Sequence, residues 1–217
     1  MNSVRAVLFD LDGTLVDSAP DLAAAVNFMR SQRGLPELPI EVLRPWASHG
    51  ARGLLGAGLN ITPEDPDFLT LRDEFLNRYE KNLAIHTRIF PALEPVLQEI
   101  EQRALPWGIV TNKHARFTTP LVHALGLDQR TGVIVSGDTT PHAKPHPAPL
   151  LFAAEKIGIP PQHCLYVGDD LRDVQAGQAA GMKTVVVTYG YCGGETPPEQ
   201  WGGDYLIHTP QELLALL

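Results

Sequence analysis

The chain has 217 residues, a net charge of −8 at pH 7 and 44% hydrophobic residues. This length predicts one domain, or one core with a modest insertion, and the composition is typical of a globular protein rather than a disordered one. The acidic balance argues against binding of nucleic acid or of an anionic membrane, because both need clustered positive charge. No apolar run is long enough for a signal peptide or a membrane span, and two cysteines cannot form a disulfide framework, so we expect a cytoplasmic protein.

Short apolar runs alternate with stretches of helical periodicity along most of the chain. The predicted strands lie at residues 4–9, 107–110, 133–135, 164–167 and 184–187, with a weaker one at 205–207. The predicted helices of this part lie at residues 93–103, 117–125, 149–157 and 174–180. This alternation predicts an α/β fold with a doubly wound, mostly parallel sheet, that is, a Rossmann-like core.

The segment between Ser18 and His86 interrupts this alternation, because its pattern is helical and contains no convincing strand. Ser18 and Asp21 resemble a capping box at the start of the first helix. A one-face stripe that includes Phe75 and Tyr79 predicts a later helix, and we interpret these aromatic residues as core. We therefore expect a small all-helical cap at residues 17–86, inserted into a core of residues 1–16 and 87–217.

Charged and polar side chains follow several of the predicted strands. The first strand ends in Asp10-Leu11-Asp12-Gly13-Thr14, the second in Thr111-Asn112-Lys113, and the fourth in the segment 168–173, which holds three aspartates. Taken alone, the first of these segments could be an ordinary Asx turn, and Lys144, which follows a loop, could be a surface lysine. Because the carboxyl ends of the strands form the ligand-binding edge of an open α/β sheet, we expect these groups to meet there.

So many carboxylates at one edge would repel one another and raise their own pKa values unless a cation compensates them. Carboxylate oxygens at this density favour Mg²⁺, which keeps water ligands that a phosphate can replace. Glycines, helix N-termini and Lys144 would then serve to bind an anion. The residues by themselves therefore predict a metal-assisted phosphoryl-transfer site.

In this order, the segments resemble the four motifs of the haloacid dehalogenase-like superfamily, and the resemblance covers essentially the whole chain. Asp10-Leu11-Asp12-Gly13-Thr14 and Gly168-Asp169 with Asp173 are the specific motifs, whereas Thr111 and Lys144-Pro145 agree in order and spacing. The resemblance implies a Mg²⁺-dependent phosphatase that acts on a small phosphorylated metabolite.

The resemblance also implies the roles of the core residues. Asp10 would be the nucleophile that takes the phosphoryl group, and Asp12 the acid and base that protonates the leaving oxygen and then activates water. Thr111 and Lys144 would hold phosphoryl oxygens, with Lys144 also offsetting the charge around Asp10.

The implied Mg²⁺ ligands are Asp10, the backbone carbonyl of Asp12, and Asp169, with Asp173 steadying the metal or its waters. Asp170 stands where many members of the superfamily carry a small hydroxyl residue, so the resemblance gives it no role.

Within the superfamily, the chain is similar to the phosphoglycolate phosphatase subgroup and, more narrowly, to the N-acetylmuramic acid 6-phosphate phosphatases. The narrower similarity rests on the segments 48–52, 110–113 and 190–191 and on Trp201-Gly202. It implies that Asn112, His49, Gly50 and Arg52 contact the substrate. We interpret residues 48–52 as a flexible loop whose Arg52 binds a substrate carboxylate. The sequence predicts no oligomeric state.

Other functions share parts of this pattern. A phosphomutase has every motif and differs only in returning the phosphoryl group to a sugar, and a catalytically inactive binding module could keep the same scaffold. A two-component receiver domain would be shorter and lack the cap, and a haloalkanoate dehalogenase does not need the carboxylate at Asp12. We reject a zinc site because no C-x-x-C spacing occurs, and His142 and His146 lie in a Pro-rich loop rather than on one helical face.

Overall fold

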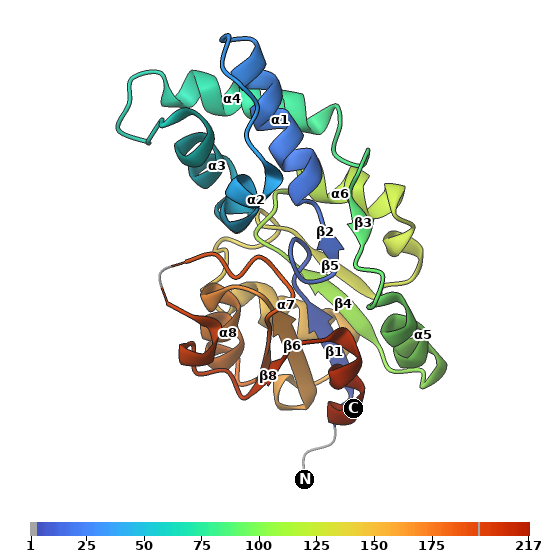
Figure 1. The fold of residues 1–217 in the computed structure, drawn as a ribbon. Helices are drawn as coiled ribbons and strands as arrows, with labels where there is room; N and C mark the ends of the chain where they lie inside the picture. Colours follow the sequence, from blue (N-terminus) through green and yellow to red (C-terminus); the bar gives the residue numbers. More distant parts are fainter. Residues whose placement is uncertain (1–3, 195) are drawn as a thin grey trace.

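A computed structural model of the protein describes residues 4–194 and 196–217, which form a six-stranded sheet flanked by helices (Figure 1). The order of the strands is β5-β4-β1-β6-β7-β8, and every neighbouring pair is parallel. The strands are β1 (Ala6–Phe9), β4 (Trp107–Val110), β5 (Val133–Val135), β6 (Cys164–Gly168), β7 (Lys183–Val187) and β8 (Tyr205–Ile207). The predicted α/β class is therefore confirmed, with a sheet that is parallel throughout.

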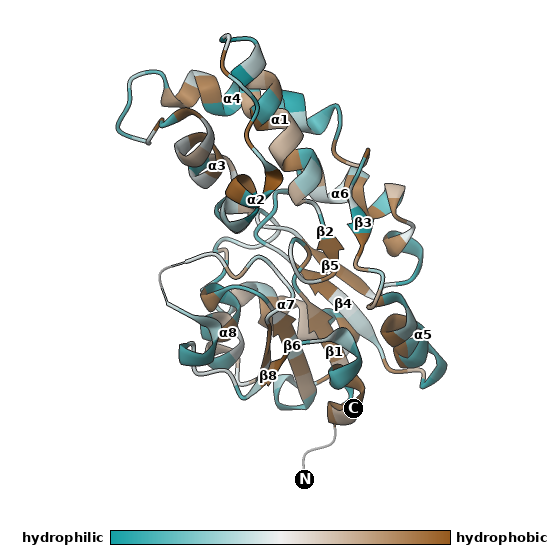
Figure 2. Cartoon of the chain, in the orientation of Figure 1, coloured by the Kyte–Doolittle hydropathy of each residue, from teal (hydrophilic) through white to brown (hydrophobic). Residues whose placement is uncertain are grey.

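Helices cover both faces of this sheet because its central strands are apolar on both sides. Val7 and Phe9 of β1 pack in one hydrophobic cluster, which includes residues of α5 (Glu94–Gln102) and α6 (Ala115–Ala124). Ala6 and Leu8 point the other way, into a cluster with residues of α7 (Ala148–Ile157) and α8 (Leu171–Ala179). Figure 2 shows the corresponding apolar colouring of the central strands. The sheet is thus doubly wound, as the sequence predicts.

The inserted helices lie beyond the carboxyl ends of the strands (Figure 1). They are α1 (Ala19–Ser31), α2 (Ile40–Leu43), α3 (Gly50–Leu59) and α4 (Phe68–Glu80), with a 3-10 helix at Arg44–His49. Two short antiparallel strands, β2 (Val16–Asp17) and β3 (Arg88–Ile89), flank the insertion. The all-helical character of the insertion agrees with the sequence, while the division of the chain at residues 17 and 86 stays a prediction.

Further short 3-10 helices occur at Leu127–Gln129, Pro161–His163, Pro198–Gln200 and Pro210–Leu216. In the part of the chain that the structure describes, no helix is long and apolar enough to cross a bilayer.

Two local predictions in the cap are wrong. Ser18 does not cap α1 with its side chain, because its hydroxyl donates to Asp12 and the Asp21 carboxylate accepts from the backbone of His86 and Thr87 instead. Residues 48–52 are not a flexible loop, because they divide between the 3-10 helix and the start of α3. Gly50 stands at the junction with φ +57°, a value that favours glycine.

Candidate active site

The site lies at the carboxyl ends of β1, β4 and β6, which are neighbours in the sheet. Asp10 and Asp12 follow β1, Thr111 follows β4, and Asp169 follows β6. The chain adds strands on the β4 side first and then crosses to the β6 side, so β1 stands where the winding of the sheet reverses. Such a switch point opens a crevice that α/β proteins use for ligands.

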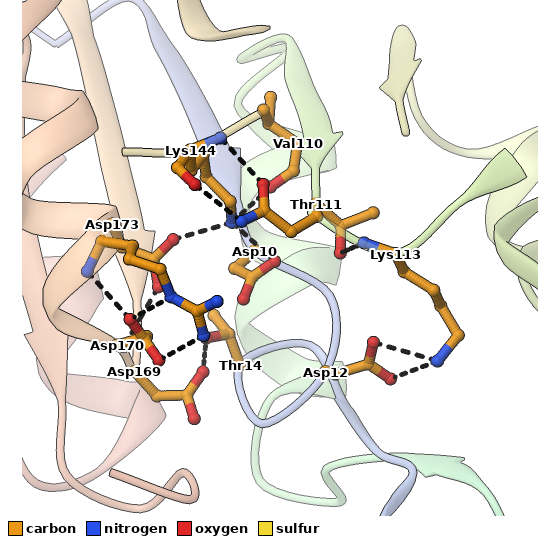
Figure 3. A network of polar contacts seen from close by, with 12 residues as sticks. Asp10, Asp12, Thr14, Val110, Thr111, Lys113, Lys144, Asp169, Asp170 and Asp173 are labelled. Atoms are coloured by element: carbon orange, nitrogen blue, oxygen red, sulfur yellow. Dashed lines mark hydrogen bonds and ion pairs between the residues drawn. The ribbon is translucent and has the colours of Figure 1, made fainter. Parts of the chain in front are cut away.

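Lys144 reaches into this crevice from the loop after β5, and its side chain is only 3% exposed. Its ammonium lies 2.9 Å from Oδ1 of Asp10 and 2.7 Å from Oδ1 of Asp173. It also donates to the carbonyl of Val110 at 3.0 Å and to the hydroxyl of Tyr166 at 2.8 Å. Figure 3 shows the lysine head group with Asp10, Asp173 and Val110 around it. The sequence-based alternative of a surface lysine is therefore excluded.

Asp10, Asp169 and Asp173 each offer a carboxylate oxygen within 4.8 Å of the others. Asp169 is fully buried and accepts hydrogen bonds from the Thr14 hydroxyl and the Tyr191 N–H, both at 2.8 Å. These two donors orient the carboxylate but leave its charge without a cationic partner among the described residues.

Burial is the main cause of perturbed acidity in this cluster. It raises the pKa of Asp10 to about 6, although the neighbouring Lys144 opposes the rise. Burial, followed by the charges of Asp10 and Asp173, raises the pKa of Asp169 well above its ordinary value. Oδ1 of Asp10 is buried and accepts no hydrogen bond of good geometry from the described residues. A hard divalent cation such as Mg²⁺ fits this set of oxygens, since it would both bind them and offset their repulsion.

Asp173 differs from the other two carboxylates because the protein already uses both of its oxygens. Oδ1 accepts from Lys144 and from the Tyr166 hydroxyl, and Oδ2 accepts from the backbone N–H of Asp170 at 3.1 Å. The geometry therefore suits Asp173 to hold Lys144 in place. The carboxylate oxygens of Asp10 and Asp169 are better available to a metal.

Asp12 is held from two sides. The Nζ of Lys113 lies 3.1 Å from both of its carboxylate oxygens, and the Ser18 hydroxyl donates to one of them. The ammonium of Lys113 also lies 4.8 Å from the centre of the Tyr79 ring. Figure 3 shows Lys113 reaching Asp12 from the side away from Asp169. Sequence reasoning did not single out Lys113 or Ser18 as partners of Asp12.

Thr111 and Asn112 follow β4 and line the same cavity. Thr111 is buried, and its hydroxyl accepts from the backbone N–H of Lys113 at 3.1 Å. The Asn112 amide accepts from the backbone N–H of Lys144 at 2.9 Å and donates to the Lys144 carbonyl at 2.8 Å. This pair of bonds ties the end of β4 to the loop that carries Lys144, which is a positioning contact in addition to any contact with substrate.

The cavity between the sheet and the cap has a volume of about 290 Å³, at the lower end of the range for small-ligand sites. The core supplies its charged floor, and the cap supplies apolar walls from α4 and the first turn of α3. Phe75 and Tyr79 are buried, as the sequence suggests, yet they also line this cavity. The helical spacing of these residues in the sequence predicts that they are buried, but it cannot reveal that they also line a cavity.

His49 and Gly50 line the cavity, whereas Arg52 does not. Because residues 50–59 are helical, Arg52 stands exposed on α3, where its charge acts on Glu64. Arg172 is the arginine of the cavity wall, and it bridges core and cap by donating to the Ser48 carbonyl at 2.7 Å. The expectation that Arg52 faces the site is not met.

Asp170 has a structural contact set that the sequence did not predict. Its carboxylate caps α8 by accepting from the Arg172 N–H, and it pairs with the Arg172 guanidinium at 2.7 Å. Trp201 is buried in a small cluster and donates to the Thr196 carbonyl, so it anchors its loop and does not line the cavity that contains Asp10 and Asp12.

Comparisons with known proteins agree with this geometry. The sequence profile of the haloacid dehalogenase-like hydrolases matches residues 7–187. The N-acetylmuramic acid 6-phosphate phosphatase of Pseudomonas aeruginosa is 42% identical over 99% of this chain and 95% of its own length. The phosphoglycolate phosphatase of Xanthomonas campestris pv. campestris is 45% identical over 98% of this chain and 96% of its own length.

Among solved structures, a predicted phosphoglycolate phosphatase from Haemophilus somnus superposes with a TM-score of 0.85 at 29% identity. The match covers 100% of this chain and 99% of that one. The profile match spans most of the chain and includes β1, β4 and β6, the strands that carry the site. The chain therefore belongs to the haloacid dehalogenase-like hydrolase family.

Proposed function

We propose that this protein is a Mg²⁺-dependent phosphatase that hydrolyses a phosphomonoester of a small metabolite through a phosphorylated aspartate. The observation that carries the proposal is the placement of Asp10 next to Lys144 and close to the buried Asp169, with Asp10 and Lys144 lining a cavity of small-metabolite size. Named phosphatases among its relatives support the same reaction class.

In the first proposed step, a carboxylate oxygen of Asp10 attacks phosphorus and the bond from phosphorus to the substrate alcohol oxygen breaks. Asp12 gives its proton to the departing alcohol oxygen. In the second step, Asp12 takes a proton from a water molecule, whose oxygen attacks the phosphorus and releases Asp10 and inorganic phosphate. Asp12 is suited to this role because Lys113 and Ser18 fix its orientation next to Asp10.

Asp10, the backbone carbonyl of Asp12, and Asp169 would hold Mg²⁺. When bound, the ion would supply positive charge that polarises the phosphoryl group and offsets the repulsion among the carboxylates. Thr111 would donate to a phosphoryl oxygen. Lys144 would act mainly by offsetting the charge of Asp10, because its protons already face protein acceptors.

For the substrate, we propose N-acetylmuramic acid 6-phosphate, the substrate in the name of the relative that matches at 42% identity. Phosphoglycolate is the second candidate, because a phosphatase named for it is 45% identical to this chain. Both molecules are phosphomonoesters that also carry a carboxylate. A comparison of kcat/KM for the two substrates on the same preparation decides between them, and we expect the sugar phosphate to be the better one.

The reaction class is tested with p-nitrophenyl phosphate, in MgCl₂ and in EDTA. We expect turnover only with Mg²⁺, and a loss of at least about four decades in Asp10→Asn, whose amide cannot attack phosphorus. The isosteric change Asp73→Asn, on the exposed surface of α4, is the matched control and should leave turnover unchanged. Asp10→Asn activity within tenfold of the wild type would contradict the proposed nucleophile.

A further inference from the structure

The cavity holds three lysine or arginine side chains among the described residues: Lys113, Lys144 and Arg172. Lys144 contacts two carboxylates, a carbonyl and a hydroxyl, which use all the protons of its ammonium. Arg172 pairs with the Asp170 carboxylate and donates to a cap carbonyl. Lys144 thus has no donor left for a ligand, and Arg172 already uses three of its five N–H donors within the protein.

Lys113 also has capacity for a ligand. Its side chain is 9% exposed, and although burial would lower its pKa, Asp12 and the nearby Tyr79 hydroxyl raise it. Its hydrogen bonds of good geometry to described residues both go to the carboxylate of Asp12. An ammonium has three N–H donors, so this contact with a single carboxylate leaves room for a second acceptor. On the other side, the ammonium lies beside the Tyr79 ring and its hydroxyl, a neutral group that competes with an anion less strongly than a carboxylate would.

The hydroxyl of Tyr79 is a second sign of a missing partner at the same place. Tyr79 is 2% exposed and lines the cavity, and its hydroxyl interacts with the Lys113 ammonium but makes no hydrogen bond of good geometry with a described residue. A buried hydroxyl without a well-formed hydrogen bond is costly. Its ring is fixed between Phe75, at 6.4 Å between centroids, and Phe117, at 5.8 Å, so the hydroxyl cannot easily turn elsewhere.

We infer that the Lys113 ammonium and the Tyr79 hydroxyl bind the second anionic group of the substrate, its carboxylate. The inference rests on the proposed function and assigns the substrate specificity of that site. Lys113 then holds Asp12 and the substrate carboxylate together, while the phosphoryl group lies over Asp10. Core and cap each supply one contact, so a substrate with both groups spans the two. Arg52, the sequence-based candidate for this contact, lies outside the cavity.

The test uses two pairs of substrates that differ in the carboxylate. N-acetylmuramic acid 6-phosphate is compared with N-acetylglucosamine 6-phosphate, which lacks the lactyl group, and phosphoglycolate with ethyl phosphate. For the pair that the wild type hydrolyses faster, we compare kcat/KM of the carboxylated substrate with kcat/KM of its partner without a carboxylate. We expect Lys113→Met to lower this ratio by roughly ten- to a hundredfold, the effect of losing one charge-assisted contact. Lys183→Met is the matched control, since Lys183 pairs with an aspartate outside the cavity and should leave the ratio unchanged.

An equal loss on both members of each pair would overturn the inference, because Lys113 would then act only through Asp12. Tyr79→Phe removes only the hydroxyl beside Lys113, so it tests the inference even if Lys113→Met does not fold. We expect a selective loss of roughly three- to tenfold on the carboxylated substrate, and an unchanged ratio would exclude the hydroxyl. Failure of the proposed function would look different, because the wild type with MgCl₂ would then hydrolyse none of the four compounds.

Discussion

Lys144 shows how a single buried charge organises the residues of the site. It stands between the carboxylates of Asp10 and Asp173, 2.9 Å and 2.7 Å from its ammonium. Burial alone would lower the pKa of this lysine, but the two carboxylates raise it, so the side chain stays charged. Its removal would leave two buried acids facing each other without compensation.

We therefore predict that Lys144→Ala lowers both stability and activity. The free energy of unfolding should fall by about 3–5 kcal/mol, the usual cost of breaking a buried ion pair, and kcat/KM by at least about tenfold. Urea unfolding and p-nitrophenyl phosphate turnover measure the two effects. Lys156→Ala, on the exposed surface of α7, is the control. Equal behaviour of the two variants would show that the Lys144 charge is not needed.

The core residues of the site were predictable from the sequence because each stands directly after a predicted strand or within a short motif. The contact of Lys113 with Asp12 was not, because 101 positions separate the two residues in sequence. Tyr79 was expected only in the core, since helical spacing reveals a buried face but not a cavity within it.

At the scale of elements, the turn after β1 has to pass unusually close to the end of β6. Gly13 has φ +84°, and a Cβ atom at this position would lie 2.2 Å from Oδ2 of Asp169. The turn from β1 thus packs directly on the proposed metal ligand, and only glycine fits there.

Gly13→Ala should therefore displace the Asp169 carboxylate or unfold the turn. We expect a loss of stability of at least about 1 kcal/mol, from the left-handed backbone alone, together with a large loss of turnover. Gly126→Ala is a useful comparison, because Gly126 has φ +68° but open space around its Cβ position. If Gly13→Ala loses no more activity than Gly126→Ala, close packing on Asp169 is not required.

The elements themselves were largely predictable from apolar runs, since the predicted strands at 107–110, 133–135 and 205–207 match β4, β5 and β8. The capping box at Ser18 was not predictable, because its hydroxyl and the Asp21 carboxylate find partners that only the folded chain brings near. The short strands β2 and β3 likewise depend on pairing across the whole insertion.

At the scale of the whole molecule, the carboxylate cluster should make stability depend on pH and on metal. Burial raises the pKa of Asp10 from 3.8 to about 6, and that of Asp169 shifts in the same direction. Between 3.8 and about 6, the metal-free folded state therefore holds protons that the unfolded chain has released. The contribution of these groups to stability thus falls as pH rises through this window.

We predict that Asp169→Asn flattens this pH dependence and raises the melting temperature in EDTA at about pH 7, because one buried charge is gone. MgCl₂ should raise the melting temperature of the wild type but not of the variant. Thermal unfolding between about pH 4 and 7 measures both effects, with Asp73→Asn, at an exposed site on α4, as the control. Equal slopes in wild type and Asp169→Asn, with no gain from MgCl₂, would contradict the metal assignment.

In the proposed reaction, Asp10 carries the phosphoryl group between the two steps, so the phosphorylated enzyme can be trapped and the modified residue located. In Asp12→Asn, the amide cannot take a proton from water, so the phosphorylated enzyme should accumulate. The variant is mixed with MgCl₂ and p-nitrophenyl phosphate, quenched rapidly and analysed by mass spectrometry. We expect a gain of one phosphoryl group located on Asp10. Continued hydrolysis without any phosphorylated chain, or a phosphoryl group on another residue, would contradict it.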